Sequence, residues 1–351
     1  MGSSVIENKL RTLGSRGFPS IGSIELTTRC NLACRYCFVT PEKKELPTDE
    51  LCRALDRFAD AGIISLMLTG GEPFMREDIL DILAYIVNKK FFRTIVLSNG
   101  TLLQPCHIDF LAAHAAFFGY LRFSFFSHDP AVHDSFTGVS GSFGRTLANA
   151  ERLINGGVKV MVIINLTEDN VDTLQKTKEF FAIRGFGVEV GVSKINTDKR
   201  IRGLCKPMTT GPFFDRYFSG IEETGLDAMR GSFETICGRP DNGNLLCEQL
   251  FSMISLRADG SIVPCLSFRN HAISNITSDT RPLHLILQNS PLLQSLRKLR
   301  RADLQKCGVC PFVNFCVLCP GMMHTENGSF EQPLEQTCTY TRRLHAAMYG
   351  S

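Results

Sequence analysis

Several features that would place this chain in another class of protein are missing from its sequence. No apolar run approaches the ~20 residues needed to cross a bilayer, and the N-terminus has no signal-peptide pattern. A net charge of +3 over 351 residues is too small to indicate a nucleic-acid partner. The sequence contains no internal repeat, no low-complexity segment and no Gly-Lys-Ser/Thr phosphate loop. We therefore expect a cytoplasmic protein with no membrane and no nucleic-acid partner.

Cysteine, by contrast, is abundant, with 14 residues in the chain. Without an export signal these cysteines are not expected to form disulfides, and many of them cluster at spacings typical of metal ligands. The hydrophobic fraction of 44% and the length of 351 residues provide for one large domain and a smaller one.

The first cysteine cluster follows a short apolar strand at Ile24–Leu26. Cys30, Cys34 and Cys37 have the spacing Cys-x3-Cys-x2-Cys, and thiolates suit iron–sulfur clusters. Three cysteines leave one iron of a [4Fe–4S] cube without a protein ligand. That iron can chelate the amino and carboxylate groups of S-adenosylmethionine (SAM). Zinc would require a fourth ligand nearby, and none follows before Cys52.

A glycine-rich turn, Thr69-Gly70-Gly71-Glu72-Pro73, ends the next predicted strand. Backbone carbonyls exposed by two glycines, together with the Glu72 carboxylate, can accept hydrogen bonds from an ammonium group. The cysteine cluster and this turn together resemble the radical SAM superfamily. The resemblance implies SAM contacts at Tyr36, Gly70, Gly71, Glu72 and Pro73.

The resemblance extends more loosely to four residues on later strands and helices. Ser98 and Asn99 end the third predicted strand, where the family often places a polar contact to the ribose. Ser124 ends the fourth strand and Arg145 opens the following helix, where related enzymes hold the methionine carboxylate. The planar donor fork of arginine suits that role. Capping of strand ends is the alternative role for Ser124 and Asn99.

Phe126 stands where many relatives carry an acidic residue, in a Ser-Leu-Asp-Gly run. The missing acid puts in doubt any mechanism that uses it as a base, and weakens a match to the sulfatase-maturing branch. Nearby candidates for substrate contact, with simple solvation as the alternative, are His128, Asp129, His133 and Asp134.

From Ile24 to about Ser193 the sequence alternates apolar strands with amphipathic helices. The predicted strands are Ile24–Leu26, Ile64–Leu68, Thr94–Ser98, Tyr120–Phe125, Lys159–Asn165 and Gly187–Val192, and the predicted helices are Thr48–Ala61, Asp78–Asn88, His107–Ala115, Ser142–Asn155 and Val171–Arg184. Near-continuous apolar strands separated by helices indicate a parallel sheet. Six such units predict an α/β fold, a partial, open (β/α)6 TIM-like barrel. Active sites in such sheets lie at the carboxyl ends of the strands, where both motifs fall.

The C-terminal third carries a second cysteine pattern. Cys247-x12-Gly260-x4-Cys265 precedes Cys307-x2-Cys310-x5-Cys316-x2-Cys319, and Cys338 follows. This resembles the SPASM extension of radical SAM enzymes, which binds two auxiliary [4Fe–4S] clusters. The family pattern assigns Cys247, Cys265 and Cys319 to one cluster, and Cys307, Cys310, Cys316 and Cys338 to the other. Cys237 either completes the first of these clusters or leaves it with an open iron.

A zinc site is the rival interpretation of this pattern. The spacing of Cys307, Cys310, Cys316 and Cys319 is legitimate for a four-cysteine zinc site. It leaves Cys247, Cys265 and Cys338 unexplained. Among the remaining cysteines, Cys205 could donate a hydrogen atom to a substrate radical, as some peptide epimerases require, or be an inert thiol.

The resemblance covers about residues 22–340 and divides the chain into three parts. These are a radical SAM partial barrel at 20–194, a helical connector at 195–234, with Thr210–Gly220 its most apolar part, and a SPASM domain at 235–345. It implies SAM and three [4Fe–4S] clusters as cofactors, and an external electron donor of the flavodoxin or ferredoxin type. The first cluster would cleave SAM reductively to a 5′-deoxyadenosyl radical, which abstracts a hydrogen atom from the substrate.

Family members with two auxiliary clusters most often modify peptides or small proteins. The sequence therefore predicts maturation of a ribosomally made peptide, by a thioether or carbon–carbon crosslink or by epimerisation. Many such enzymes carry an N-terminal winged-helix domain, and its absence here points to a separate peptide-recognition protein or to direct binding at the barrel. The alternatives are oxidation of a protein side chain or small metabolite, and a zinc-stabilised binding module without catalysis.

Overall fold

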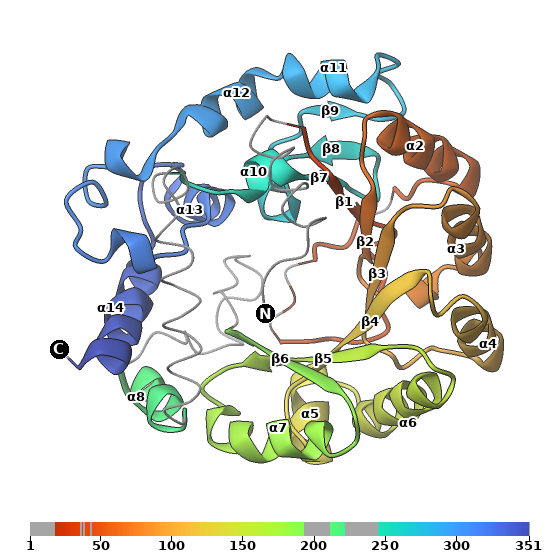
Figure 1. Ribbon diagram of the computed structural model, residues 1–351, viewed down its shortest axis with the longest axis horizontal. Coiled ribbons are helices and arrows are strands. Elements are labelled where there is room, and N and C mark those ends of the chain that lie inside the picture. Colours follow the sequence, from red (N-terminus) through yellow and green to blue (C-terminus); the bar gives the residue numbers. More distant parts are fainter. Residues whose placement is uncertain are drawn as a thin grey trace.

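A computed structural model describes residues 18–350 except 36, 38, 43, 193–210 and 222–244. Its described strands form one curved sheet in the order β6-β5-β4-β3-β2-β1-β7-β8-β9, with helices around the outside (Figure 1). The strands are β1 (Ile21–Glu25), β2 (Ser65–Thr69), β3 (Arg93–Ser98), β4 (Phe118–Phe125), β5 (Val160–Leu166), β6 (Gly187–Val192), β7 (Met253–Leu256), β8 (Ser261–Val263) and β9 (Ser274–Asn275).

Strands β1 to β6 are parallel and joined by helices, which confirms the predicted α/β partial barrel. The helices of this part are α2 (Thr48–Asp60), η1 (Pro73–Met75), α3 (Ile79–Asn88), α4 (Pro105–Ala113), α5 (Pro130–Thr137), α6 (Ser142–Asn155), η2 (Val171–Thr173), α7 (Leu174–Ala182) and α8 (Gly211–Ser219). Every predicted strand and helix has a counterpart, whereas η1 and α5 were not predicted. α8 falls within the predicted connector, in its most apolar stretch.

The two faces of the sheet differ, as strand alternation requires. On β4, Leu121, Phe123 and Phe125 are buried against the helices, while Arg122 and Ser124 on the opposite face are only partly buried. Apolar burial between sheet and helices therefore forms the main core, whereas the inner face is only partly buried and carries polar as well as apolar side chains.

The C-terminal extension continues this sheet rather than forming a separate unit. β7 pairs in parallel with β1, and β8 and β9 follow antiparallel. Three strands of the extension therefore share the sheet of the barrel. Its helices are α10 (Gln249–Ser252), η3 (Leu266–Phe268), α11 (Leu283–Gln288), α12 (Pro291–Lys298), η4 (Arg301–Asp303), η5 (Val313–Phe315), α13 (Pro320–Asn327) and α14 (Glu335–Tyr349).

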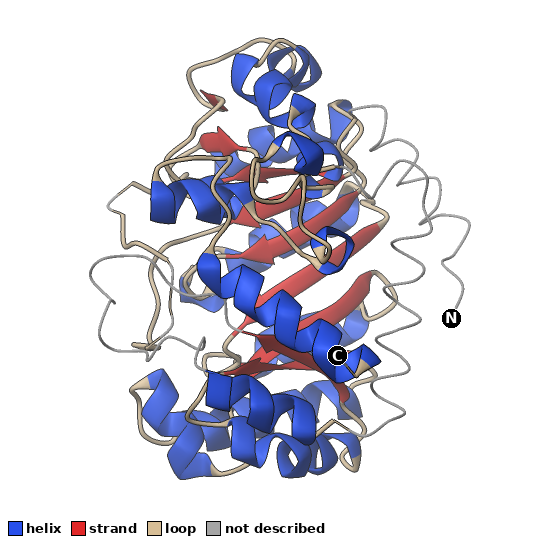
Figure 2. Ribbon diagram, turned by 90° about the vertical axis from the view of Figure 1, so that its left-hand side faces the viewer, coloured by secondary structure: helices blue, strands red, loops and turns tan. Residues whose placement is uncertain are grey.

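The side of the ring opposite β1–β4 is occupied by α14 and α8. Tyr340 of α14 lies 5.5 Å from Phe214 of α8, measured between ring centroids, and 6.2 Å from Phe218. Figure 2 is viewed from this side and shows α14 in front of the strands. In the described part of the chain, helices rather than further parallel strands thus flank the open edge of the barrel. Among the described residues, none of the helices combines the length and the apolar character that crossing a membrane requires.

Candidate active site and auxiliary cysteine sites

The glycine-rich turn after β2 docks directly onto the loop that carries the first three cysteines. Gly71 N donates to Thr27 O and Glu72 N donates to Arg29 O, each at 2.8 Å. A Cβ on Gly70 would lie 2.4 Å from Thr27 O, and one on Gly71 would lie 2.2 Å from Arg29 O. Both glycines are therefore required by the close approach of two backbones, which brings the two sequence motifs together at the carboxyl end of the sheet.

The Glu72 carboxylate points into the protein. Its Oε1 accepts from Ser98 Oγ at 2.8 Å and Phe74 N at 3.1 Å, and its Oε2 accepts from Asn99 N at 2.7 Å. Burial raises the pKa of this fully buried carboxyl to about 7, and the three donors partly oppose that rise. The side chain joins the ends of β2 and β3, so the backbone carbonyls of the turn remain the acceptors proposed for the SAM ammonium.

Asn99 connects this junction to the first cysteine. Its Nδ2 lies 3.7 Å from Cys30 Sγ and 3.0 Å from Asn31 Oδ1, and Leu32 N donates to the same sulfur at 3.5 Å. Burial raises the pKa of the Cys30 thiol, and these two donors lower it. Donors aimed at a thiolate orient it and tune a cluster that it binds.

A short helix that sequence reasoning missed supports the other side of the cysteine loop. Ala33 N donates to Thr137 O at 2.9 Å and Arg35 N donates to Phe136 O at 3.0 Å, both acceptors lying in α5. The helix begins where Asp129 accepts from Ala131 N at 2.8 Å, with Pro130 at its first position. An aspartate followed by proline is a known helix-start signal and could have revealed α5.

The residues around Phe126 have structural roles. Phe126 is 1% exposed and stacks on Phe136 with ring centroids 4.8 Å apart. His133 is also 1% exposed, and burial lowers its pKa to about 4. Its expected substrate contact is therefore wrong, because the ring is enclosed by phenyl groups.

The other three candidates near Phe126 are also held by the protein. Asp129 caps α5, and His128 Nδ1 lies 3.0 Å from Thr177 Oγ1. Asp134 accepts from Ser142 Oγ at 2.8 Å and Phe143 N at 2.9 Å, at the start of α6. Helix capping explains the two aspartates, so neither of them is free to act as a general base here.

One buried guanidinium, which the sequence did not reveal, ties the two ends of the cysteine loop together. Arg76 Nη1 donates to Leu26 O at 3.0 Å and to Leu46 O at 3.1 Å. Its Nε and Nη2 bind the Asp78 carboxylate at 2.8 and 2.6 Å. The loop from 26 to 46 is thus closed at its base, which limits the positions its cysteines can adopt.

The remaining predicted SAM contacts are more dispersed. Ser124 lies on the inner face of β4, in register with Ile163 of β5. Arg145 is exposed in the first turn of α6, where its Nη2 donates to Ser140 O at 3.3 Å. Tyr36, Cys205 and Cys237 lie outside the described residues.

The auxiliary cysteines fall into two spatial groups, although their order along the chain is interleaved. Burial raises the pKa of the Cys265 thiol to about 12, and the charges of Cys319 and Cys247 add to the rise. Burial likewise raises the pKa of Cys307 to about 11, with contributions from Cys316, Cys338 and Cys310. These interactions require proximity, so the structure brings together the same two groups that the family pattern assigns to separate clusters.

The second group surrounds a cavity of about 360 Å³. Cys307, Cys310, Cys316 and Cys338 all line it. Among the described residues, no three His, Cys, Asp or Glu side chains are placed to hold one metal ion. Four thiols around one cavity fit a multi-iron cluster, since each cysteine then binds a different iron.

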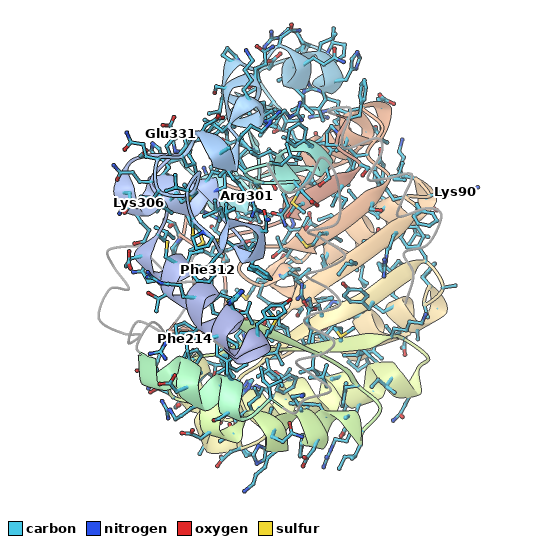
Figure 3. All side chains as sticks on the ribbon, turned by 60° about the vertical axis from the view of Figure 1, so that its left-hand side comes forward. Lys90, Phe214, Arg301, Lys306, Phe312 and Glu331 are labelled. Atoms are coloured by element: carbon cyan, nitrogen blue, oxygen red, sulfur yellow. The ribbon has the colours of Figure 1, made fainter. Side chains whose placement is uncertain are left out.

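Arg301 organises the loops of this cavity. Its Nη1 donates to Val313 O and Cys316 O, both at 2.7 Å, and its Nε donates to Leu245 O at 2.8 Å. The positive charge lowers the pKa of Cys316 and Cys307, although burial dominates both shifts. Figure 3 labels Arg301 together with Lys306 and Phe312 in this part of the extension.

Comparison with known proteins identifies the family. A Radical SAM superfamily model matches residues 24–181, and an iron–sulfur cluster-binding (SPASM) model matches residues 247–311. An AdoMet-dependent heme synthase of Nitratidesulfovibrio vulgaris is 32% identical, over 91% of this chain and 92% of that protein. This chain belongs to the radical SAM superfamily. The radical SAM protein is therefore an enzyme that uses SAM and iron–sulfur clusters, which replaces the interpretation as a zinc-stabilised binding module.

Two further similarities place this radical SAM/SPASM enzyme among its relatives. The antilisterial bacteriocin subtilosin biosynthesis protein AlbA of Bacillus subtilis is 27% identical, over 91% of this chain and 71% of that protein. The crystal structure of native anSMEcpe with bound AdoMet has a TM-score of 0.74 at 16% identity, covering 95% of this chain and 97% of that one. The second similarity concerns the fold alone.

Proposed function

We propose that this enzyme modifies a peptide made on the ribosome, by forming a thioether or carbon–carbon crosslink or by epimerising a residue. The similarity to AlbA, a bacteriocin biosynthesis protein, supports this substrate class because it extends over 91% of the chain. The two groups of auxiliary cysteines accord with it, since they provide for the two-cluster extension common among peptide-modifying members.

The residues of the barrel hold the cofactors in this proposal. Cys30, Cys34 and Cys37 bind the first cluster, with Asn99 and Leu32 N directing donors at the Cys30 sulfur. When bound, this cluster and SAM supply a 5′-deoxyadenosyl radical that abstracts a hydrogen atom from the substrate. The carbonyls of the glycine-rich turn accept from the SAM amino group, and Ser124 and Arg145 hold its carboxylate.

The extension binds two more clusters in this proposal, which makes three in total. Cys247, Cys265 and Cys319 hold one, with Cys237 as its fourth ligand, and the four cavity cysteines hold the other. Cys205 is the proposed hydrogen-atom donor if the product is an epimer. The proposed parts of the chain are the barrel at 20–194, the connector at 195–234 and the extension at 235–345. The proposed electron donor is a separate protein of the flavodoxin or ferredoxin type.

The test is incubation of the reconstituted enzyme, SAM and reductant with precursor peptides encoded next to its gene. The product is examined by mass spectrometry and by chiral amino-acid analysis, beside a Cys30/Cys34/Cys37 triple-alanine variant. A mass loss of two hydrogens or a D-residue, absent from the variant, would support the proposal. No change in mass or stereochemistry, in an enzyme that still cleaves SAM, would count against a peptide substrate.

A second candidate is the production of heme or a similar small molecule. The specific observation in its favour is the 32% identity to a heme synthase across 92% of that protein's length. Incubation of the same reconstituted enzyme with heme precursors, followed by heme detection from its absorbance, separates this candidate from the peptide proposal.

A further inference from the structure

One arginine of the extension carries an unused hydrogen-bonding edge inside the barrel. Arg269 follows η3, and its Nη1 donates to Glu25 Oε1 at 2.7 Å. The Arg269 side chain is 13% exposed and that of Glu25 is 1% exposed. Nε and Nη2 of Arg269 are both buried, and neither has a hydrogen-bond partner within the described residues. Buried donors without partners are costly, and a native structure usually satisfies them.

The two unused nitrogens form the edge of a guanidinium that holds a carboxylate in two parallel hydrogen bonds. The chain itself uses this edge repeatedly. Nε and Nη2 together bind a carboxylate at distances between 2.6 and 3.3 Å in three pairs, namely Arg76 with Asp78, Arg281 with Asp279, and Arg29 with Glu45. Arg269 has the same edge free, with its third nitrogen already committed to Glu25.

The location of Arg269 is the carboxyl end of the barrel, beside the first cysteine loop. Glu25 is the last residue of β1 and pairs with Thr69, the last residue of β2. Its neighbours Ile24 and Leu26 are buried in the core, so alternation places Glu25 on the inner face of the sheet. The charges of Arg269 and Glu25 both act on the Cys37 thiol, which places the pair next to the first cluster site.

The nearby acidic side chains are already engaged and do not satisfy the free edge. Glu25 Oε2 accepts from Ala258 N at 3.4 Å while Oε1 takes Arg269 Nη1. Glu42 and Asp259 are paired with Arg257, and that arginine in turn donates to Arg269 O at 3.1 Å. Among the described residues this edge of Arg269 has no acceptor, so an acceptor from elsewhere is needed, and a carboxylate fits a guanidinium edge best.

We propose that the Nε/Nη2 edge of Arg269 binds a carboxylate of the substrate. The class of ligand is a compound bearing a carboxylate on a flexible arm: an aspartate or glutamate side chain of a peptide, or a carboxylic acid side arm of a small molecule. A planar fork matches both carboxylate oxygens, and a buried setting strengthens each charge-assisted bond. Held there, the carboxylate fixes which carbon of the substrate lies near the first cluster. The inference rests on the proposed function in that the substrate enters at this end of the barrel.

The test measures binding and requires no turnover. Two acids, glutarate and the acetylated, amidated tripeptide Gly-Glu-Gly, are titrated into reconstituted holoenzyme with saturating SAM and no reductant. Their uncharged counterparts are glutaramide and Gly-Gln-Gly. Binding is measured by saturation-transfer NMR. At least one of the two acids is expected to bind the wild-type enzyme, whereas the matching uncharged amide is expected not to bind. Arg269→Gln is expected to lower the affinity for that acid by about tenfold or more. Arg269→Lys is expected to lower it by an intermediate factor.

Arg122→Gln is the matched control. Arg122 also lies on the inner face, pairs with Glu189 at 2.7 Å and has a buried Nε without a partner, but its Nη2 is already occupied. This variant is expected to bind the acids within about twofold of the wild type, because its free edge is incomplete. Equal losses in the two variants would overturn the proposal, since they would show a general charge effect.

The remaining outcomes identify the ligand or overturn the assignment. Binding of the tripeptide alone supports a peptide carboxylate, and binding of glutarate alone supports a small-molecule acid. Unchanged binding in Arg269→Gln, or binding of neither acid to the wild type, overturns the proposal. A tenfold loss of SAM affinity or the loss of the first cluster's iron in that variant assigns Arg269 to the cofactors and also overturns it. Because no peptide has to be modified, failure of the proposed function leaves this test intact.

Discussion

Gly71 and Arg29 are in such close contact that a Cβ added to Gly71 would lie 2.2 Å from the carbonyl oxygen of Arg29. Arg29 immediately precedes Cys30, so this contact sets the position at which the cysteine loop leaves the sheet. The glycine-rich turn thus has a role in shaping the cluster loop, separate from any contact that its carbonyls make with SAM.

Gly71→Ala is expected to displace the cysteine loop, because the clash is with backbone and cannot be relieved by a side-chain rotation. We expect the loss of about four irons after reconstitution, and a fall in SAM cleavage of about tenfold or more. Gly144→Ala in α6 is the control, since its Cβ meets nothing within 4 Å. Normal iron content in Gly71→Ala would contradict this account of the turn.

Arg301 is expected to be needed for the cavity lined by four cysteines. A lysine at position 301 cannot bind the carbonyls of Leu245, Val313 and Cys316 together, because its ammonium is a point charge rather than a planar fork. We predict a loss of about four irons, with the EPR signal of the first cluster unchanged. The control is Lys306→Ala, because Lys306 is exposed at the rim of the same cavity. A full iron count in Arg301→Lys would contradict the prediction.

His133 is expected to make folding sensitive to acid. Its pKa is about 4 in the folded chain, below its ordinary 6.5, so the unfolded chain binds a proton in this interval and the folded chain does not. The stabilising contribution of the neutral ring is present above pH 6.5 and is lost as pH falls towards 4. His133→Phe should remove this fall in the free energy of unfolding, which amounts to about 3 kcal/mol.

Glu72 acts in the opposite direction over an overlapping interval. Its pKa rises from 4.5 to about 7 on folding, so its contribution to stability is present below pH 4.5 and is lost as pH rises through 7. The His133 effect must therefore be measured as the difference in unfolding free energy between wild type and His133→Phe at each pH. A difference that does not change between pH 4 and pH 6.5 would show the assignment to be wrong.

The three-cluster proposal predicts the iron content directly. Reconstituted wild type is expected to hold about twelve irons, and the Cys30/Cys34/Cys37 and Cys307/Cys310 alanine variants about eight each. A Cys265→Ala variant is expected to lose iron without affecting the other two sites, because Cys265 interacts with Cys319 and Cys247. About eight irons in the wild type would mean that one auxiliary site is unfilled.

The parallel strands and their helices were predictable because the local pattern of apolar residues determines them. The pairing of β1 with β7 was not, since Ile21 and Met253 are far apart in sequence and nothing local to either specifies the partner. α5 was missed because its eight residues are mixed in polarity, although Asp129 and Pro130 mark its start. Short elements and distant pairings depend on tertiary contacts that no sequence window contains.

The candidate site divides in the same way. The spacing of the cysteines predicts which of them belong to one group, and the structure brings the members of each auxiliary group together. The direction of a side chain does not follow from spacing: the inward orientation of Glu72 and the free edge of Arg269 become visible only in three dimensions. Phe126 is the clearest case, because a substitution that looked like the loss of an acid is a core aromatic residue in the structure.

Phe126→Asp is therefore expected to unfold the barrel rather than to restore a base. The ring is 1% exposed and stacked on Phe136, which carries part of the cysteine loop. Removing it and burying a carboxylate among phenyl rings should cost more than about 4 kcal/mol, whereas Phe126→Leu should cost about 1–2 kcal/mol. Denaturant unfolding of the cluster-free protein measures both values. If Phe126→Asp folded with a normal midpoint, the side chain at 126 would have to reach solvent, and an acid there could take part in catalysis after all.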